Sequence, residues 1–271
     1  MINYQLNEYS FITRGMDMDR KVVIVTGGSS GMGKAIAKKQ AEEGWNVMIT
    51  GRTQETLEAA KEEIETFAGQ VAVCRMDVRS VEDVEQMITE AAGRFGTIDA
   101  LVNNAAGNFI CPAEKLSVNG WKAVIDIVLN GTFYCSQAAG RYWIKEKKRG
   151  QILNMVATYA WGAGAGVVHS AAAKAGVLSL TRTLAVEWGS AYGIRCNAIA
   201  PGPIERTGGA EKLFESEEAA HATIKSVPLK RLGTPEEIAG LAAFLLSEQA
   251  GYVNGECVTM DGGQWLNPRP F

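Results

Sequence analysis

A glycine-rich run near the start of the chain has the residue types and spacing of a phosphate-binding loop. It reads Thr26-Gly27-Gly28-Ser29-Ser30-Gly31-Met32-Gly33 and leads from an apolar segment into a helical pattern. Glycines permit a tight turn, and the N-terminus of the following helix favours an anion because its N–H groups are unpaired. Alone, the run could be a structural loop, but between a first strand and a first helix it predicts a site for the pyrophosphate of a dinucleotide.

The end of the second predicted strand indicates which dinucleotide is bound. NAD-selective sites place Asp or Glu there, which accepts a hydrogen bond from the ribose 2′-hydroxyl. Here the strand ends Ile49-Thr50-Gly51-Arg52, and a guanidinium suits a 2′-phosphate because it is planar and permanently charged. We therefore predict NADPH as the cofactor rather than NADH, the alternative being that Arg52 is an exposed loop charge. Asp77 and Val78, after the third strand, are expected to meet the adenine.

Short apolar runs that alternate with helical patterns would position these loops. The predicted strands are Lys21–Thr26, Asn46–Thr50, Val71–Arg75, Ala100–Asn103, Gln151–Val156, Arg195–Ile199 and Cys257–Met260. Helical spacing places two sets of apolar residues each on one face of a predicted helix: Leu57, Ala60, Ile64 and Phe67, and Val84, Met87, Ile88, Ala91 and Phe95. The segment Thr234-Pro-Glu-Glu237 predicts the start of a further helix.

This order of elements predicts an α/β fold of the single-domain, doubly wound Rossmann type. We expect a parallel sheet of about seven strands with helices on both faces and ligands at the carboxyl ends of the strands. No linker-like segment divides the chain. Residues 1–19 are therefore predicted to be an N-terminal extension and residues 20–271 one domain.

Composition excludes several other classes of protein. Of 271 residues, 46% are hydrophobic and 21% charged, which is typical of a globular protein rather than a disordered one, and a net charge of −3 gives no pull toward nucleic acid or an anionic membrane. Five dispersed cysteines and two unpaired histidines encode neither a disulfide framework nor a metal site, so we predict no metal. The first residues lack the pattern of a signal peptide, and we expect a cytoplasmic protein.

Four motifs together resemble the short-chain dehydrogenase/reductase family over roughly residues 20–266. They are TGxxxGxG at 26–33, Asn103-Asn-Ala-Ala-Gly107, Asn130 in a later helix, and Pro201-Gly-Pro-Ile204. The resemblance implies that the cofactor is held by Gly27, Ser29, Ser30, Gly31, Met32, Gly33, Arg52, Asp77, Val78, Asn104, Ala105, Lys174, Pro201, Gly202 and Ile204. It also implies that Lys174 binds the nicotinamide ribose.

The usual catalytic tyrosine of that family is missing here. Its position, four residues before Lys174, holds Ser170, and the usual serine position falls near Ala157. A serine hydroxyl is far less acidic than a phenol, whose reference pKa is about 10, so ordinary carbonyl reduction is not expected. Instead Tyr159, Ser170 and Lys174 resemble the arrangement of the 2,4-dienoyl-CoA reductase branch, as does the segment Ala105-Ala-Gly-Asn-Phe109.

The resemblance to that branch implies a separate catalytic role for each of these residues. Hydride delivery to C5 of a dienoyl thioester leaves a dienolate whose charge collects on the thioester oxygen, so the reaction needs preorganised donors there. The resemblance makes Tyr159 and Asn108 those donors, Lys174 the residue that orients the ribose, and Ser170 a helper, with Asn130 as a further catalytic residue or a purely structural one. Plainer alternatives are a loop aromatic at Tyr159, a helix N-cap at Ser170, an exposed lysine at Lys174 and a turn asparagine at Asn108.

We therefore predict an NADPH-dependent reductase that converts 2,4-dienoyl-CoA to 3-enoyl-CoA in the β-oxidation of unsaturated fatty acids, and, from the resemblance, a homotetramer. Its partner is an acyl-CoA substrate. The alternatives are a reductase of 3-oxoacyl or small carbonyl substrates, and a non-catalytic NADPH-binding regulatory protein. Residues Glu205–Ser226, with Glu211, Glu215, Glu217 and Glu218, are expected to form a lid over the substrate or a solvated acidic face, and the cations near this segment are Lys212, Lys225, Lys230 and Arg231.

Overall fold

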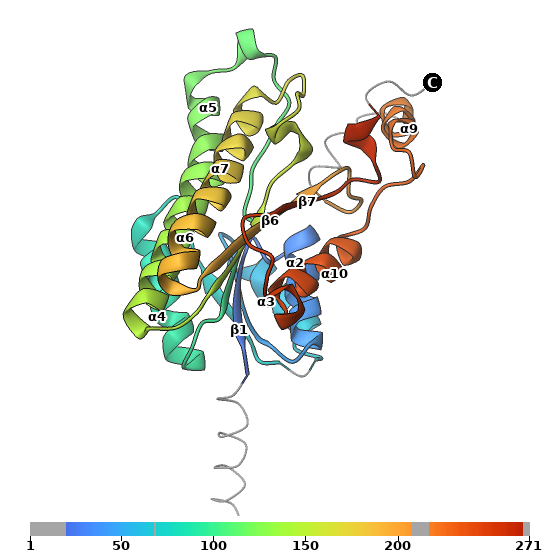
Figure 1. Ribbon diagram of the computed structural model, residues 1–271. Coiled ribbons are helices and arrows are strands. Elements are labelled where there is room, and N and C mark those ends of the chain that lie inside the picture. Colours follow the sequence, from blue (N-terminus) through green and yellow to red (C-terminus); the bar gives the residue numbers. More distant parts are fainter. Residues whose placement is uncertain (1–19, 68, 208–216, 268–271) are drawn as a thin grey trace, which may run out of the picture.

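The computed structural model describes residues 20–67, 69–207 and 217–267, and its centre is one parallel sheet (Figure 1). The N-terminal extension predicted for residues 1–19 lies outside this range. Seven strands run in the order β3-β2-β1-β4-β5-β6-β7. They are β1 Val22–Thr26, β2 Asn46–Gly51, β3 Val71–Arg75, β4 Ala100–Asn103, β5 Gln151–Met155, β6 Arg195–Pro201 and β7 Cys257–Met260. The predicted strands and the doubly wound fold are therefore confirmed: β3, β4 and β7 have the predicted ends, and the other strands differ by one or two residues at one end.

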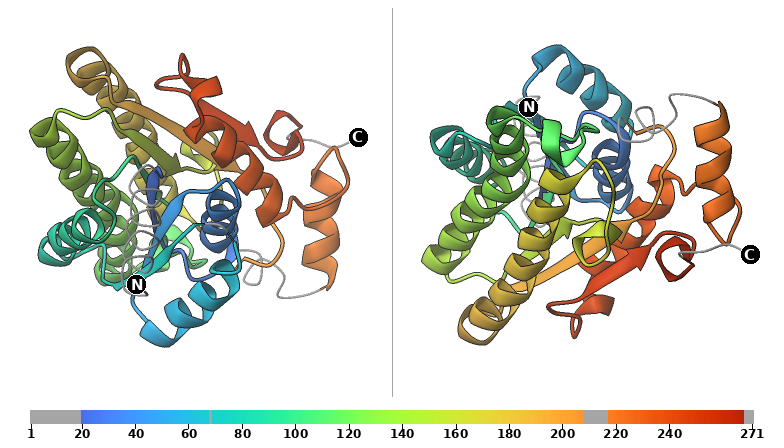
Figure 2. Two further views of the ribbon diagram at one scale, coloured as in Figure 1. Left: turned by 90° about the horizontal axis from the view of Figure 1, so that it is seen from below. Right: turned by 90° about the horizontal axis from the view of Figure 1, so that it is seen from above.

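Helices cover both faces of this sheet (Figure 2). One layer holds α2 (Gly31–Glu42), α3 (Gln54–Ile64) and α10 (Pro235–Leu246), and the other holds α4 (Val81–Phe95), α5 (Val118–Ile125), α6 (Gly131–Glu146) and α7 (Val168–Tyr192). Helix α9 (Glu217–Ser226) stands away from the sheet in Figure 1. Within the described ranges no helix is long and apolar enough to cross a bilayer.

Single-turn segments connect the longer elements around the site. A π-helical turn, η2 (Asp126–Asn130), lies between α5 and α6, and a 3₁₀ turn, η3 (Thr158–Ala160), follows β5. Three more 3₁₀ turns are η1 (Ala113–Lys115), η4 (Glu248–Ala250) and η5 (Gln264–Leu266). The turns η2 and η3 matter most here, because they carry Asn130 and Tyr159.

The alternation of side chains along β1 explains why both faces are covered. Successive residues of a strand point to opposite faces. Val23 and Val25 join a core with residues of α2, α3 and α10, whereas Val22 and Ile24 join a second core with residues of α4 and α6. All four are fully buried, so β1 is the centre of a three-layer domain.

The predicted helix patterns hold at the level of single residues with one exception. Leu57, Ala60 and Ile64 are buried on α3, but that helix ends at Ile64, so Phe67 lies beyond it and packs, partly buried, against the same core. Val84, Met87, Ile88, Ala91 and Phe95 are all buried on one face of α4. Thr234 accepts a hydrogen bond from the N–H of Glu237, whose carboxylate accepts one from the N–H of Thr234, so the expected capping box opens α10. The capping box therefore determines where α10 begins.

Candidate active site

The glycine-rich loop after β1 turns tightly and lies close to neighbouring backbone. Gly27 and Gly31 have φ angles of 63° and 51°, in the left-handed region that favours glycine. A Cβ atom added to Gly33 would lie 2.2 Å from the carbonyl oxygen of Gly27. The amide of Asn104 donates to the carbonyl oxygens of Thr26 and Gly27, at 3.0 Å each. Asn104 thereby ties the loop to the end of β4.

This loop fits the pyrophosphate of a dinucleotide. It opens α2, where the side chain of Ser30, the N-cap residue, forms no cap hydrogen bond and the first turn carries no acidic residue. The N–H groups of that turn and the positive end of the helix dipole can therefore meet an anion. The predicted cofactor residues Ser29, Ser30 and Met32 are at least partly exposed on this loop.

The ends of β2 and β3 form the neighbouring part of the same edge. The N–H of Gly28 donates to the carbonyl oxygen of Thr50 at 3.1 Å, and that of Met76 to the carbonyl oxygen of Gly51 at 2.8 Å. Arg79 forms an ion pair with Asp77 and, through hydrogen bonds, lowers the pKa of that carboxyl group. Val78 is buried against α6. Arg52 and Asp77 thus lie where an adenosine would extend from the loop.

Tyr159 and Ser170 are brought together although eleven residues separate them. The Tyr159 hydroxyl lies 3.0 Å from the Ser170 Oγ. Tyr159 stands on η3, directly after β5, and Ser170 lies in the first turn of α7. Because α7 begins at Val168 with Val167 as its N-cap, the interpretation of Ser170 as the N-cap is wrong. A plain loop aromatic would not explain this contact with a buried hydroxyl.

Lys174 lies one helical turn after Ser170 and is buried rather than exposed. Its side chain is only 7% exposed, and Nζ donates to the carbonyl oxygen of Met155 at the end of β5. The interpretation of Lys174 as an ordinary surface lysine is therefore wrong. A buried ammonium at the carboxyl edge of the sheet supplies a fixed donor and a local positive charge.

The ionisation of these groups follows from burial. Burial raises the pKa of Tyr159, and its hydrogen bond with Ser170 only partly opposes that change. Burial lowers the pKa of Lys174 to about 8. At neutral pH the phenol therefore stays protonated and the lysine stays charged, so the Tyr159 hydroxyl is available as a neutral hydrogen-bond donor.

Asn108 belongs to a segment that packs on the start of α7. Its side-chain oxygen accepts a hydrogen bond from the N–H of Phe109 at 2.9 Å. The ring of Phe109 meets the buried ring of His169 edge-on, with 4.5 Å between centroids, and His169 Nδ1 accepts a hydrogen bond from the N–H of Ser170. These contacts hold the Asn108 segment beside the element that carries Ser170 and Lys174.

Asn130 stands at the end of η2, where α6 begins. Its amide donates to the carboxylate of Asp126 at 2.8 Å, within the same turn. The preceding residue, Leu129, packs against Gly176 of α7, where a Cβ atom would lie 2.8 Å from a Leu129 methyl group. This turn therefore supports α7 at a position two residues after Lys174. The contact suits a structural role for Asn130 at least as well as a catalytic one.

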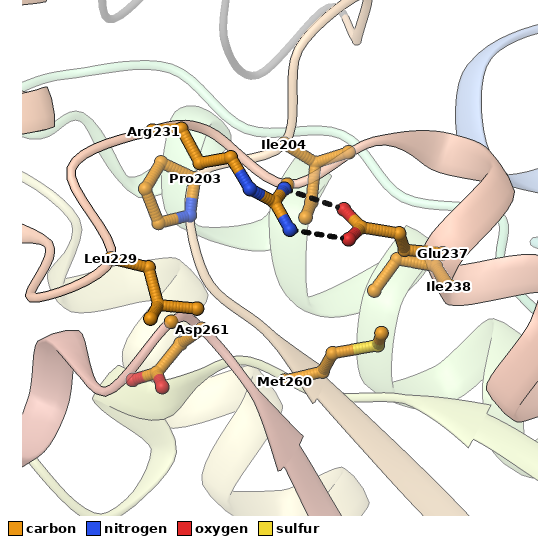
Figure 3. Close-up of a pocket in the computed structure, with 10 residues that line it drawn as sticks. Pro203, Ile204, Leu229, Arg231, Glu237, Ile238, Met260 and Asp261 are labelled. Atoms are coloured by element: carbon orange, nitrogen blue, oxygen red, sulfur yellow. Dashed lines mark hydrogen bonds and ion pairs between the residues drawn. The ribbon is translucent and has the colours of Figure 1, made fainter.

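The segment after β6 lines a small cavity of about 100 Å³ (Figure 3). Pro203 and Ile204 face Met260 and Asp261 across it. Gly202 precedes this segment, and a Cβ atom there would lie 2.6 Å from the Asp261 Cβ. Pro201, Gly202 and Ile204 therefore lie at the carboxyl edge of the sheet, and their contact with a cofactor stays a prediction.

A larger hollow of about 600 Å³ lies at the opposite edge of the sheet. Lys21, Gln151 and Arg195, at the amino ends of β1, β5 and β6, line it. Its size does not make it the candidate active site, because open parallel sheets bind their ligands at the carboxyl ends of the strands.

The predicted lid is only partly within the described chain. Residues 208–216, which include Glu211, Lys212 and Glu215, lie outside it, and α9 covers Glu217–Ser226. Of the cations near this segment, Arg231 is engaged by both carboxylate oxygens of Glu237, as Figure 3 shows. Lys230 Nζ donates to the carbonyl oxygen of Lys225. Arg231 is therefore a poor candidate for binding the phosphates of CoA.

A buried polar network behind the site was missed by the sequence analysis. The Asn103 amide donates to Ser136 Oγ and to Asn154 Oδ1, and the Asn154 amide donates to Thr181 Oγ1, at 2.8–2.9 Å. The network joins β4, β5, α6 and α7. An asparagine inside the apolar strand 151–155 was the available signal, because a buried amide requires partners.

The fold and this site together define a class of protein. A doubly wound sheet, a TGxxxGxG loop and a buried lysine one turn after a hydroxyl on the helix that follows β5 are features of short-chain dehydrogenases/reductases. A family model described as "Enoyl-(Acyl carrier protein) reductase" matches residues 27–264. The chain belongs to this family of short-chain oxidoreductases.

Several named relatives are similar to this chain along nearly its whole length. A "Probable 2,4-dienoyl-CoA reductase [(2E)-enoyl-CoA-producing]" of Bacillus subtilis (strain 168) is 76% identical over 94% of this chain and 100% of its own length. A "Peroxisomal 2,4-dienoyl-CoA reductase [(3E)-enoyl-CoA-producing]" of Danio rerio is 38% identical over 96% of this chain and 87% of its own length. A crystallised short chain dehydrogenase of Bacillus anthracis str. 'Ames Ancestor' is 64% identical, with a TM-score of 0.86 over 93% of this chain and 100% of that one.

Proposed function

We propose that this enzyme reduces 2,4-dienoyl-CoA to 3-enoyl-CoA with NADPH, in the β-oxidation of unsaturated fatty acids. The observation that carries the proposal is the 3.0 Å contact between Tyr159 and Ser170, one helical turn from the buried Lys174. It supplies a phenol donor where the usual tyrosine is replaced by serine. The names of the relatives from Bacillus subtilis and Danio rerio support the same substrate class.

The proposed chemistry needs donors for one developing charge. The reduced nicotinamide, when bound, supplies hydride to C5 of the substrate. Electron density then moves through the conjugated chain to the thioester oxygen, where the Tyr159 hydroxyl and the Asn108 amide donate hydrogen bonds. Because the pKa of Tyr159 is raised by burial, the phenol keeps its proton, as a donor to an oxyanion must.

Lys174 and Ser170 act around this donor pair. Lys174, fixed by the carbonyl oxygen of Met155, orients the nicotinamide ribose and adds positive charge that stabilises the dienolate. Ser170 accepts or donates the hydrogen bond that fixes the direction of the Tyr159 hydroxyl. Asn130 supports α7 through the turn at Leu129, and it stays a predicted member of the catalytic set.

NADPH is the proposed cofactor because the end of β2 carries Arg52 instead of an acidic residue. Gly27, Ser29, Ser30, Gly31, Met32 and Gly33 would hold its pyrophosphate, with Asn104 and Ala105 behind them. Asp77 and Val78 would meet the adenine, and Pro201, Gly202 and Ile204 the nicotinamide.

The position of the product double bond is a separate question, on which the relatives' names differ. Protonation of the dienolate at Cα gives 3-enoyl-CoA, and protonation at C4 gives 2-enoyl-CoA. We propose Cα, where the enolate carbon lies next to the thioester carbonyl that Tyr159 and Asn108 would hold. A 2-enoyl product would overturn this part and leave the reductase assignment in place.

The test is NADPH oxidation with 2,4-hexadienoyl-CoA, followed by identification of the product by NMR in deuterated buffer. Acetoacetyl-CoA and NADH serve as control substrate and cofactor. Turnover of the dienoyl thioester supports the proposal. Turnover of acetoacetyl-CoA alone would favour a 3-oxoacyl reductase, and tight NADPH binding without turnover of either would indicate a regulatory protein.

The proposal also includes a cytoplasmic location and a homotetrameric assembly. All five cysteines are free thiols, which supports a reducing, cytoplasmic setting. Val118 and Trp121 on α5, Phe133 on α6 and Val186 on α7 are exposed apolar residues, at 73%, 37%, 40% and 75%. Such residues on neighbouring helices support burial between subunits of the expected homotetramer, which light scattering would test.

A further inference from the structure

A second arginine lies beside Arg52 at the carboxyl edge of the sheet. Arg75 is the last residue of β3, and the parallel pairing of β2 with β3 sets it opposite Gly51, the residue before Arg52. Its Nε donates to the carbonyl oxygen of Arg52 at 3.3 Å. One edge of the Arg75 guanidinium is thereby fixed, and both arginines are exposed.

Neither guanidinium is neutralised by a neighbour within the described residues. Asp77 is the acidic group whose pKa Arg52 influences, but its carboxylate is bound by Arg79. A further acidic residue, Glu55, lies in the first turn of α3. Three arginines, Arg52, Arg75 and Arg79, therefore outnumber the two carboxylates of Asp77 and Glu55 in this region, and the local field favours an anion.

The surrounding groups add hydrogen-bond donors. Thr53, the N-cap residue of α3, forms no side-chain cap hydrogen bond, so the N–H groups of the first turn remain available. Ser29 Oγ would lie 3.8 Å from a Cβ atom on Gly51, so the glycine-rich loop borders the same spot. The ribose end of the predicted cofactor site is therefore bordered by four residues: Ser29, Arg52, Thr53 and Arg75.

We propose that Arg75 is a second phosphate-binding residue, and that Arg52 and Arg75 together hold the ribose 2′-phosphate of the dinucleotide. This inference rests on the proposed NADPH specificity and assigns part of it to a residue outside the sequence-predicted site. A phosphate monoester carries about −1.5 to −2 charges near neutral pH and three acceptor oxygens. One guanidinium cannot satisfy all of them, whereas two set side by side can approach from different directions.

The test measures binding by the full-length chain without chemistry. Isothermal titration calorimetry compares 2′,5′-ADP, which carries the 2′-phosphate, with 5′-AMP, which lacks it. The variants are Arg75→Gln, Arg52→Gln and the double variant, with Arg94→Gln as a charge-matched control on α4 beside Phe95. Thermal unfolding of each variant verifies that it is folded.

We expect Arg75→Gln to weaken 2′,5′-ADP binding by roughly tenfold to a hundredfold, the size of a lost charge-assisted hydrogen bond. Binding of 5′-AMP should stay nearly constant, and Arg75→Lys should retain part of the lost affinity. In the double variant the two fragments should bind about equally. Arg94→Gln should change neither.

Three results would overturn the inference. Equal weakening of both fragments would mean that Arg75 supports the adenosine site in general. No further loss when Arg75→Gln is added to Arg52→Gln would mean that Arg75 acts only by positioning Arg52. An unchanged preference for 2′,5′-ADP in Arg75→Gln would remove Arg75 from the site while leaving NADPH specificity intact. If the wild-type chain binds 2′,5′-ADP and 5′-AMP equally well, the proposed specificity for NADPH is itself wrong. That result is distinct from a failure of the role proposed for Arg75.

Discussion

Replacing Tyr159 with phenylalanine removes one oxygen atom from the centre of the proposed mechanism. The ring stays on η3 after β5, and the hydroxyl that lies 3.0 Å from Ser170 Oγ is lost. The side chain keeps its volume, so the glycine-rich loop and Lys174 are left in place. The variant therefore isolates the contribution of the phenol to the reaction.

The expected magnitudes separate catalysis from stability. Loss of one oxyanion donor lowers kcat by about 10²–10³-fold, equivalent to about 2.7–4 kcal/mol. KM should change little, because the donor binds a charge that develops only in the transition state. The buried Ser170 hydroxyl loses its partner, which lowers the free energy of unfolding by about 1–3 kcal/mol. The variant should therefore fold and bind NADPH, but turn over much more slowly than the wild type.

The assay is NADPH oxidation at saturating 2,4-hexadienoyl-CoA, with NADPH affinity measured separately by fluorescence. Tyr192→Phe is the matched control, since Tyr192 is 45% exposed at the end of α7. Ser170→Ala should lower kcat less than Tyr159→Phe does, because Ser170 acts through the tyrosine. A kcat in Tyr159→Phe within about fivefold of the wild type would refute the role of Tyr159 as an oxyanion donor.

Two further predictions follow from burial and from backbone crowding. Burial lowers the pKa of Lys174 to about 8, so its charge is lost as the pH rises through that value, and the NADPH dissociation constant of the apoenzyme should then increase by at most about tenfold per pH unit. Between about pH 8 and the ordinary lysine pKa of 10.5, the unfolded chain holds this proton and the folded chain does not, so the contribution of Lys174 to the free energy of unfolding should rise with pH when wild type is compared with Lys174→Met; a pH-independent affinity, or the same pH dependence in Lys174→Met, would contradict the assignment. Gly33→Ala places a Cβ 2.2 Å from the Gly27 carbonyl oxygen and should cost about 1–3 kcal/mol of stability together with NADPH affinity. Its control, Gly93→Ala on α4, meets nothing within 4 Å and should stabilise the protein by about 0.5–1 kcal/mol; equal effects of the two in thermal unfolding and NADPH titration would disprove the crowding argument.

Local patterns in the sequence were sufficient to predict the architecture of the fold. Strand and helix periodicity, the glycine-rich run and the capping box at Thr234 depend on residues that are close in sequence, and each was found where it was predicted. The resemblance to short-chain oxidoreductases added Tyr159, Ser170 and Lys174 as a set. Their types and spacing could be read directly, because a turn of helix determines which side chains share a face.

Contacts between distant segments were decided only by the tertiary structure. Whether Tyr159 meets Ser170, whether Ser170 caps α7 and whether Lys174 is buried depend on how η3 and α7 pack at the end of β5. Burial in this packing is also the main cause of the shifted pKa values of Tyr159 and Lys174. The pairing of β2 with β3, which brings Arg75 to Arg52, joins residues 23 positions apart. The sequence by itself determined the elements and the chemical groups they carry, since these follow from local propensity and periodicity. Only the folded sheet decided which groups share one edge, because parallel pairing aligns strand ends that are remote along the chain.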